Sequence, residues 1–238
     1  MKSKSLRGSR KGQAGFTLVE IAIVLVIIGL LLGGVLKGQE LIDSAKTRNA
    51  INDMNGITAA YNGYVDRFRQ IPGDDGALAT LQARGSVWTG TAGITAAGDA
   101  DSTLDIAVTA TFTPGATATS EGLAFWQHLK AAGFLAGSPS AVGTDGSAAL
   151  PRNAFNGLMG VSNNNAATPE TGAPAGLVVC LSQVPGKAAR QLDTQLDNGD
   201  AATGSLRATE GTAGANTPPA TAATAYSDEE QYTVCKSL

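Results

Sequence analysis

Glu20 is the residue of this sequence whose position needs a chemical explanation. It stands in an otherwise apolar stretch that reads "GFTLVEIAIVLVIIGLLL". A charged side chain at bilayer depth is disfavoured by roughly 2.5–3.5 kcal/mol on insertion scales, so such a residue usually has a partner. The first question is therefore which group pairs with the Glu20 carboxylate.

Other candidate chemistry is sparse. His128 is the only histidine, so the chain has no Cys/His cluster of the metal-binding kind. It lies beside Trp126 with no acid or nucleophile at motif spacing, which favours a structural or surface histidine. The Gly-rich runs match no phosphate-binding loop, because no Gly-Lys-Ser/Thr follows them.

Acidic residues gather around glycines in two turns. In "QLDTQLDNGDAATG" the oxygen-bearing side chains suit Ca²⁺, although their spacing is not that of an EF-hand and a solvated turn is the alternative. Its candidate ligands are Asp193, Asp197 and Asp200, together with Asn198. The turn "PGDDG" is a second, weaker candidate through Asp74 and Asp75. No other cofactor is expected.

The charge distribution is uneven. The chain has 17 basic and 20 acidic residues, and the first 15 residues contain five of the basic ones and no acid. The remainder therefore carries 12 basic and 20 acidic residues. This sign argues against nonspecific nucleic-acid binding through a general basic surface.

The N-terminal segment does not have the order of a secretory signal, because the small residues "GQAG" precede the apolar run. Residues 16–36 would span roughly 31 Å as a helix, close to the thickness of a bilayer core. The basic leader would stay in the cytoplasm. Beyond Lys37, apolar residues recur at helical spacing as far as Phe68, and "IPGDDG" then ends the pattern. One helix of about 50 residues is expected.

The stretch "GFTLVEIAIVLVIIGLL" after a basic leader resembles the processing motif of type IV pilins and of the pseudopilins of type II secretion. The resemblance covers roughly residues 12–70. It implies that a prepilin peptidase cuts between Gly15 and Phe16, that the new N-terminal Phe16 is methylated, and that Glu20 is the assembly residue. A generic signal anchor with a chance glutamate is the alternative.

The cut would create the missing partner. The nitrogen of Phe16 is a neutral amide before cleavage and a cation afterwards, so Glu20 of one subunit could pair with Phe16 of a neighbour. A low-dielectric surrounding strengthens such a pair, while either charge buried alone is costly.

The helix departs from many type IV pilins, which carry a proline about 20 residues after the cut. Glycines occupy that neighbourhood here, and each is roughly 1 kcal/mol worse than alanine in a helix interior. They could soften the helix or provide small faces for close helix packing. These glycines are Gly29, Gly33, Gly34 and Gly38.

The body of the chain predicts an α+β fold, in which the long helix packs on a small antiparallel sheet, as in pilins. Strands are expected at residues 105–112, 176–182 and 231–237, and helices at 121–132 and within 184–199. Ser120 is the expected N-cap of the first of these helices. The segments 85–103, 136–174 and 200–225 are expected to be loops.

Cys180 and Cys235 are the two cysteines. In a chain with an export-like start they suggest a disulfide, with two buried thiols as the alternative. In the chain-entropy model such a bond contributes roughly 4 kcal/mol. Pilins often close their C-terminal region in this way.

The expected domains are a cleaved leader (1–15), a long helix (16–71, of which 16–36 form the membrane segment or filament core) and a periplasmic or extracellular body (72–238). The resemblance implies a non-enzymatic subunit of a helical homo-oligomeric filament. Its partners would be the peptidase/methyltransferase, the inner-membrane assembly platform and the bacterial inner membrane, before assembly into a periplasmic or cell-surface filament. A minor pilin or pseudopilin is the rival within the family, and a membrane-anchored enzyme or ligand-binding domain is the rival outside it.

Overall fold

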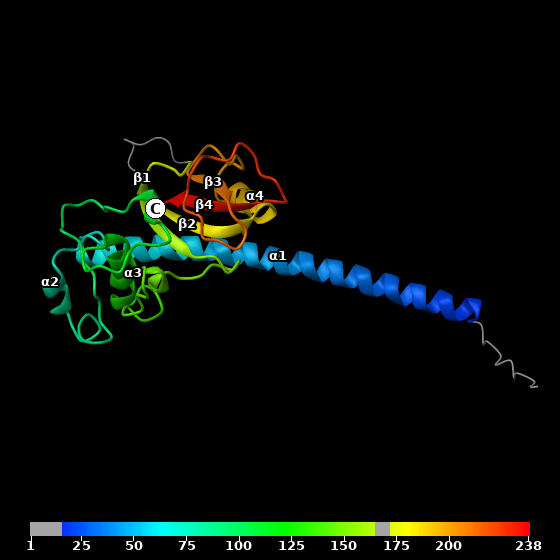
Figure 1. Ribbon diagram of the computed structural model, residues 1–238, viewed down its shortest axis with the longest axis horizontal. Coiled ribbons are helices and arrows are strands. Elements are labelled where there is room, and N and C mark those ends of the chain that lie inside the picture. The colour runs from blue at the N-terminus through cyan, green and yellow to red at the C-terminus, as the bar shows by residue number, and fades with distance from the viewer. Residues whose placement is uncertain (1–15, 165–171) are drawn as a thin grey trace, which may run out of the picture. The chain divides into compact units, whose positions relative to one another are not determined.

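The structure is a computed structural model that describes residues 16–164 and 172–238 (Figure 1). The chain divides into two compact units, of which the first ends at Ile42 and the second comprises Asp43–Leu238. Helix α1 (Leu18–Phe68) begins in the first unit and continues into the second. The long N-terminal helix expected from the apolar pattern is therefore present.

Helix α1 ends where its backbone reverses. Arg69 follows the last helical residue with φ of 57°, the left-handed conformation that often closes a helix. Gly73, in the following turn, has φ of 101°, and a side chain there would meet Leu104 at 2.6 Å and the carbonyl oxygen of Glu121 at 2.9 Å. The "IPGDDG" segment thus turns the chain sharply against the body, as its composition predicted.

The second half of α1 supplies one wall of the core. Its fully buried residues follow one another at intervals of three or four positions, which places them on one face. They are Thr47, Ala50, Met54, Ile57, Ala60 and Tyr64. Ile51, Tyr61 and Phe68 pack at the margins of the same core. The amphipathic spacing read from the sequence therefore corresponds to a real buried face.

A four-stranded antiparallel sheet completes the α+β fold. Its order is β1 (Met159–Asn164), β2 (Gly176–Pro185), β4 (Gln231–Ser237) and β3 (Leu206–Gly211) (Figure 1). Val178, Val179, Cys180 and Leu181 are consecutive and all fully buried, so both faces of β2 are covered. The predicted strands at 176–182 and 231–237 are confirmed as the two central strands.

The strand predicted at 105–112 is wrong. The segment contains a short 3₁₀ helix, η1 (Val108–Ala110), with local backbone bonds such as Thr111 N–H to Val108 O and Thr113 N–H to Ala110 O. A backbone bond does reach a strand, from the Asn163 N–H to the Ile106 carbonyl oxygen, but it does not extend into a ladder. Ile106 and Phe112 are buried without belonging to a strand. Of the β-branched residues of this segment, Ile106 and Thr111 are buried in the core rather than in a sheet.

Strands β1 and β3 lie in segments that the sequence predicted to be loops, so the prediction missed them. Both are edge strands, with sequences MGVSNN and LRATEG that have little intrinsic β preference. Each acquires its extended form by pairing with a buried central strand, β1 with β2 and β3 with β4.

The predicted short helices are confirmed as α3 (Glu121–Ala131) and α4 (Gly186–Leu196). The Ser120 side chain caps α3 by accepting the backbone N–H of Leu123, as expected. Helix α4 packs on β2, β3 and β4. The remaining helical elements are α2 (Leu78–Gln82) and the 3₁₀ turn η2 (Ser147–Ala149), both outside the predicted helices.

The Cys180–Cys235 disulfide is confirmed. The two residues are directly opposed partners of β2 and β4, with a Cα–Cα distance of 4.0 Å, and both are fully buried. The bond therefore joins the C-terminal strand to the centre of the sheet. It closes a loop that contains α4 and β3.

His128 is a structural residue of α3, as predicted. Its Nδ1 accepts the backbone N–H of Gly73 at 3.0 Å, and its Nε2 lies 3.3 Å from the carbonyl oxygen of Ala96. It therefore joins the turn after α1 to the segment before α3. Burial in this site lowers the pKa of His128 to about 4.

Acid should destabilise the body through His128. The folded-state pKa lies below the ordinary value of 6.5, so the unfolded chain binds more protons between these values and stability falls as pH drops through that window. Between pH 7 and pH 5 the expected loss is about 2 kcal/mol in the free energy of unfolding.

The measurement is denaturant unfolding of the full chain in detergent at both pH values. In His128→Asn, whose side-chain oxygen can still accept the Gly73 N–H, the difference between the two pH values should shrink by about the same amount. An unchanged pH dependence in this variant would contradict the assignment.

Candidate functional site

The first turn of α1 is built by a reciprocal pair of hydrogen bonds between Thr17 and Glu20. The backbone N–H and the hydroxyl of Thr17 both donate to Oε2 of Glu20 at 2.9 Å. The backbone N–H of Glu20 points back to Oγ1 of Thr17 at 3.3 Å. This is a capping box, in which the residue before a helix and the third helical residue satisfy each other's free backbone donors.

The capping box shows which group pairs with the Glu20 carboxylate within one chain. Within the single chain this carboxylate already has a partner, Thr17. Both donors reach the same oxygen, and across the described part of the chain no donor reaches Oε1. The Thr-x-x-Glu pattern before the apolar run was readable from the sequence as a capping signal and was missed.

The two residues of the predicted cleavage site differ in what the structure shows. Phe16 is described and is 83% exposed. Gly15 lies outside the described residues. Cleavage at this bond and methylation of Phe16 stay predictions.

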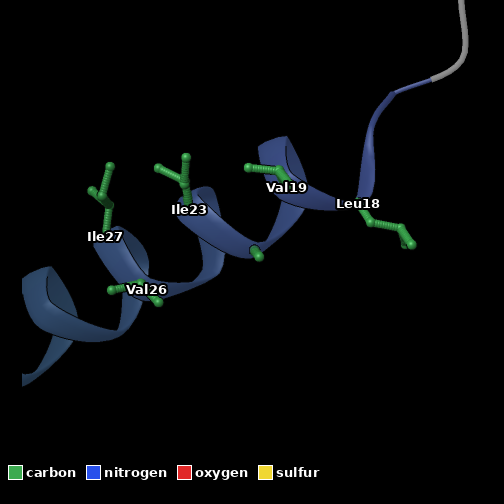
Figure 2. A pocket seen from close by; sticks show the side chains of 6 residues that line it. Leu18, Val19, Ile23, Val26 and Ile27 are labelled. Atoms are coloured by element: carbon green, nitrogen blue, oxygen red, sulfur yellow. The ribbon is translucent and has the colours of Figure 1, made fainter.

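The first unit exposes apolar surface along its whole described length. A shallow groove near the start of α1 is lined by side chains at helical spacing, and Figure 2 shows Val19, Ile23 and Ile27 projecting from one side of the helix. Leu18, Ala22 and Val26 complete the lining. An exposed apolar surface of this extent is typical of a membrane or protein contact.

Helix α1 is long and apolar enough to cross a membrane, with a mean hydropathy of 2.8 in its most apolar window. A side chain added at any of its four glycines in the first unit would meet no atom within 4 Å. No contact among the described residues therefore requires glycine at these positions. The soft-helix and close-packing interpretations both remain open.

Comparison with known proteins agrees with this geometry. Residues 10–36 match the prokaryotic N-terminal methylation motif. No curated protein matches the chain significantly. The N-terminal segment is thus a signal of the type IV prepilin class, and it precedes a long helix and a small antiparallel sheet that are consistent with a pilin-like fold.

The predicted calcium turn is held together by its own hydrogen bonds. Asp193 accepts the Gly199 N–H through Oδ1 and the Tyr226 hydroxyl through Oδ2. Asp197 accepts the Leu206 N–H at 3.0 Å, and Asp200 accepts the Ala202 N–H at 3.0 Å. These bonds account for the positions of the three carboxylates without an ion, and calcium binding here stays a prediction.

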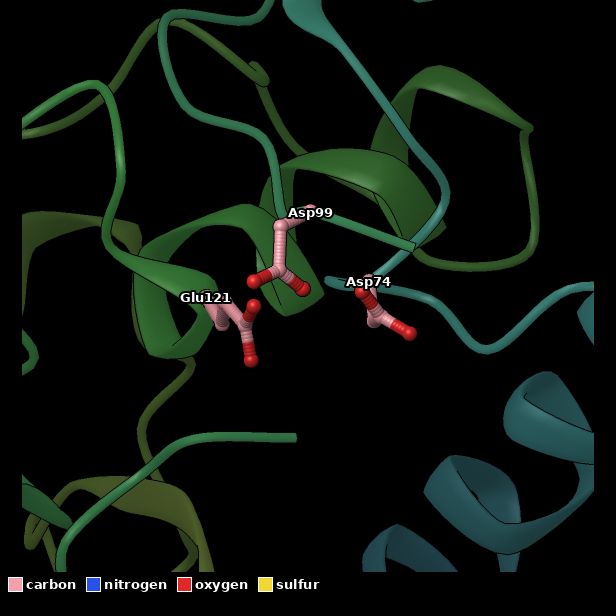
Figure 3. A group of neighbouring side chains, drawn as sticks. All are labelled: Asp74, Asp99 and Glu121. Atoms are coloured by element: carbon pink, nitrogen blue, oxygen red, sulfur yellow. The ribbon is translucent and has the colours of Figure 1, made fainter. Parts of the chain in front are cut away.

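A different set of carboxylates comes together at the end of α1. Asp74, Asp99 and Glu121 each offer an oxygen within 4.8 Å of the others, from the turn after α1, a loop and the start of α3 (Figure 3). Asp74 belongs to the weaker of the two predicted turns. Its neighbour Asp75 is paired instead with Arg84 and the Tyr64 hydroxyl.

Most of this acidic group, too, is bonded to backbone. Asp74 accepts the N–H groups of Ala100 and Ser102, and Glu121 accepts the N–H of Asp105. Burial raises the pKa of Asp74 and of Glu121, and neighbouring carboxylates add to both shifts. The negative charges of these carboxylates are therefore unfavourable where they lie. Their hydrogen bonds to backbone N–H groups hold the segments around the end of α1 together.

Removing the Thr17 hydroxyl should loosen the start of α1. Thr17→Val keeps the side-chain volume but loses both hydroxyl bonds, at an expected cost of about 1 kcal/mol, the usual worth of an N-cap. Hydrogen exchange of the first-turn amides in detergent should then become about fivefold faster. Thr17→Ser should retain protection, and equal exchange in all three proteins would contradict the capping role.

Neutralising Glu121 should stabilise the body at neutral pH. Because its pKa is raised, Glu121 binds a proton more readily in the folded state than in the unfolded chain. Its contribution to stability is therefore fully present below its unfolded-state pKa and is lost as pH rises through the folded-state pKa. Glu121→Gln keeps an acceptor for the Asp105 N–H. Its free energy of unfolding should exceed that of the wild type at pH 7, and this advantage should disappear at pH 4. A variant less stable at pH 7 would contradict the argument.

Proposed function

We propose that this protein is a structural subunit of a type IV pilus-like filament, assembled through its N-terminal helix. The observation that carries the proposal is the start of α1. A methylation motif, a carboxylate with one oxygen free and a fully exposed apolar helix occur together in residues 10–36. Each is accounted for by packing of this helix against copies of itself.

Processing supplies the charge that assembly needs. Removal of residues 1–15 by a prepilin peptidase would convert the Phe16 amide nitrogen into an ammonium group, and methylation would leave it cationic. Oε2 of Glu20 is held by Thr17 of its own chain, so Oε1 would accept the Phe16 ammonium of a neighbouring subunit. Burial between apolar helices strengthens such a pair and fixes the axial register.

The body would coat the filament. Residues 16–36 would be the membrane segment before assembly and the filament core afterwards, and residues 72–238 would form the periplasmic or extracellular domain. The Cys180–Cys235 disulfide suits that oxidising location. The expected partners are the peptidase and methyltransferase, the inner-membrane assembly platform and further copies of this chain.

The closest alternative is a minor pilin or a pseudopilin of type II secretion, which would use the same motif and helix. A membrane-anchored enzyme or ligand-binding domain is less well supported, since it would leave the position of Glu20 and the methylation motif without a role. Replacement of residues 16–40 by an unrelated membrane helix separates these classes, because only an anchored domain would keep its activity.

The Glu20 carboxylate should be required for assembly and not for processing. In a bacterium with a prepilin peptidase and an assembly system, mass spectrometry should find N-methylated Phe16 as the mature N-terminus of the wild type. Sheared surface material should contain fibres of this protein. Glu20→Gln, which keeps the shape and loses the charge, should be processed normally and reduce fibre yield at least tenfold.

Two results would contradict the proposal. One is a mature chain that still begins at Met1 or is cut after residue 36. The other is normal fibre yield from Glu20→Ala. Processed wild-type protein without fibres would favour a minor pilin or a pseudopilin.

A further inference from the structure

A pocket of about 320 Å³ opens beside the second half of α1, within the second compact unit. Asp53 and Gly56 of α1 line one side, at the three-residue spacing that puts them on one face of the helix. Lys130, Phe134 and Arg152, from α3 and the segments that follow it, line another. The pocket has the size of a small-molecule site and combines a carboxylate, two cations and an aromatic ring.

Apolar side chains line the inner part of this pocket. Ile57 and Met159 are buried core residues, and Phe134 and Leu135 pack against the same core. The backbone N–H groups of Phe134 and Leu135 both donate to the carbonyl oxygen of Leu129, which holds these two residues where α3 ends. The pocket therefore offers a preformed apolar surface to an aliphatic or aromatic group.

Charges of opposite sign stand in this pocket without pairing. Asp53 is half-buried, and no hydrogen bond or ion pair reaches its carboxylate from the residues that the structure describes. Lys130 donates to the carbonyl oxygen of Ala149 and Arg152 to that of Asn156, and within the described ranges no carboxylate pairs with either cation. Burial raises the pKa of Asp53 and lowers the pKa of Lys130. A group of opposite charge beside either side chain would offset this effect of burial.

The mixture of charges selects the charge of the ligand. A simple anion would be attracted by Lys130 and Arg152 and repelled by Asp53, and a simple cation would meet the reverse. A zwitterion satisfies both sides, because its ammonium group can pair with the carboxylate while its own carboxylate pairs with the two cations. The apolar lining then requires that the zwitterion carry an apolar group.

We infer that this pocket binds an α-amino acid with an apolar side chain. The ammonium group would donate to Asp53, the carboxylate would accept from Lys130 and Arg152, and the side chain would lie over Gly56 and against Phe134. A Cβ added at Gly56 would meet no atom within 4 Å, so this part of the wall borders open space. Such binding goes beyond the proposed filament role and does not require assembly, so it can be measured in the unassembled protein.

Ligand-observed NMR on the full chain in lipid nanodiscs tests the binding. The probes are L-phenylalanine and L-leucine, each compared with two analogues that keep its apolar group and lose one charge. Hydrocinnamate and isocaproate lack the ammonium group, and phenethylamine and isopentylamine lack the carboxylate. The amino acids should bind saturably, and each analogue should bind at least tenfold more weakly than its parent, as expected for the loss of one charged hydrogen-bonding group.

Two substitutions assign the charges separately. Asp53→Asn should weaken binding of the amino acids about tenfold and should not weaken binding of hydrocinnamate, because it removes only the partner of the ammonium group. Arg152→Gln should weaken binding of the amino acids and of hydrocinnamate, and should not weaken binding of phenethylamine.

A third substitution tests the location. Gly56→Leu adds atoms where the wall borders open space, so the variant should fold and lose binding because its side chain occupies the pocket. Asn62→Leu is the matched control, since Asn62 is exposed on the same helix and lies about 120° around it from position 56. This control should bind the amino acids as the wild type does.

Three results would overturn the site. They are the absence of saturable binding of both amino acids, equal binding of the analogues that carry a single charge, and unchanged binding in Gly56→Leu. None of them bears on processing at Phe16 or on fibre formation, so the amino-acid site and the filament function can fail independently of each other.

Discussion

The hydrogen bonds between Thr17 and Glu20 define the start of the N-terminal helix. They begin α1 at a defined residue and hold one carboxylate oxygen against the helix terminus, while no donor among the described residues reaches the other oxygen. An apolar helix with an unheld carboxylate would have to bury a mobile charge at an energetic cost. A carboxylate already fixed by its own chain loses less side-chain entropy on pairing, and it presents its charge at one height along the helix.

The body depends on the same helix in a different way. The buried face of α1 forms a wall of the core, and the turn after Phe68 is joined to α3 through His128 and to the segment after α2 through the Asp75–Arg84 ion pair. On the other side of the core, the disulfide joins the two central strands. His128 and Glu121 are both buried at the end of α1, and this burial lowers the pKa of His128 and raises the pKa of Glu121.

The acidic residues show why sequence clusters and spatial clusters differ. Asp193, Asp197 and Asp200 are near one another in the sequence, yet each is used by a separate backbone or hydroxyl donor. Asp74, Asp99 and Glu121 are separated by up to 47 positions in the sequence and come within 4.8 Å of one another, because three segments meet at the end of α1. Oxygen-rich composition therefore indicated a local turn correctly and did not indicate which carboxylates would meet.

The sequence by itself determined the N-terminal motif, the long helix with its buried face, the two central strands, helices α3 and α4 and the disulfide. The helices and strands depend on local order, helical periodicity or strong β preference, and the disulfide follows from two cysteines in a chain with an export-like start, all of which the linear sequence contains. Tertiary structure decided the edge strands β1 and β3, the non-strand path of residues 105–112 and the acidic group around Asp74. Edge strands with weak propensity are extended because a central strand offers them free backbone groups, and distant carboxylates meet because the fold brings their loops together. Those pairings exist only once the chain has folded.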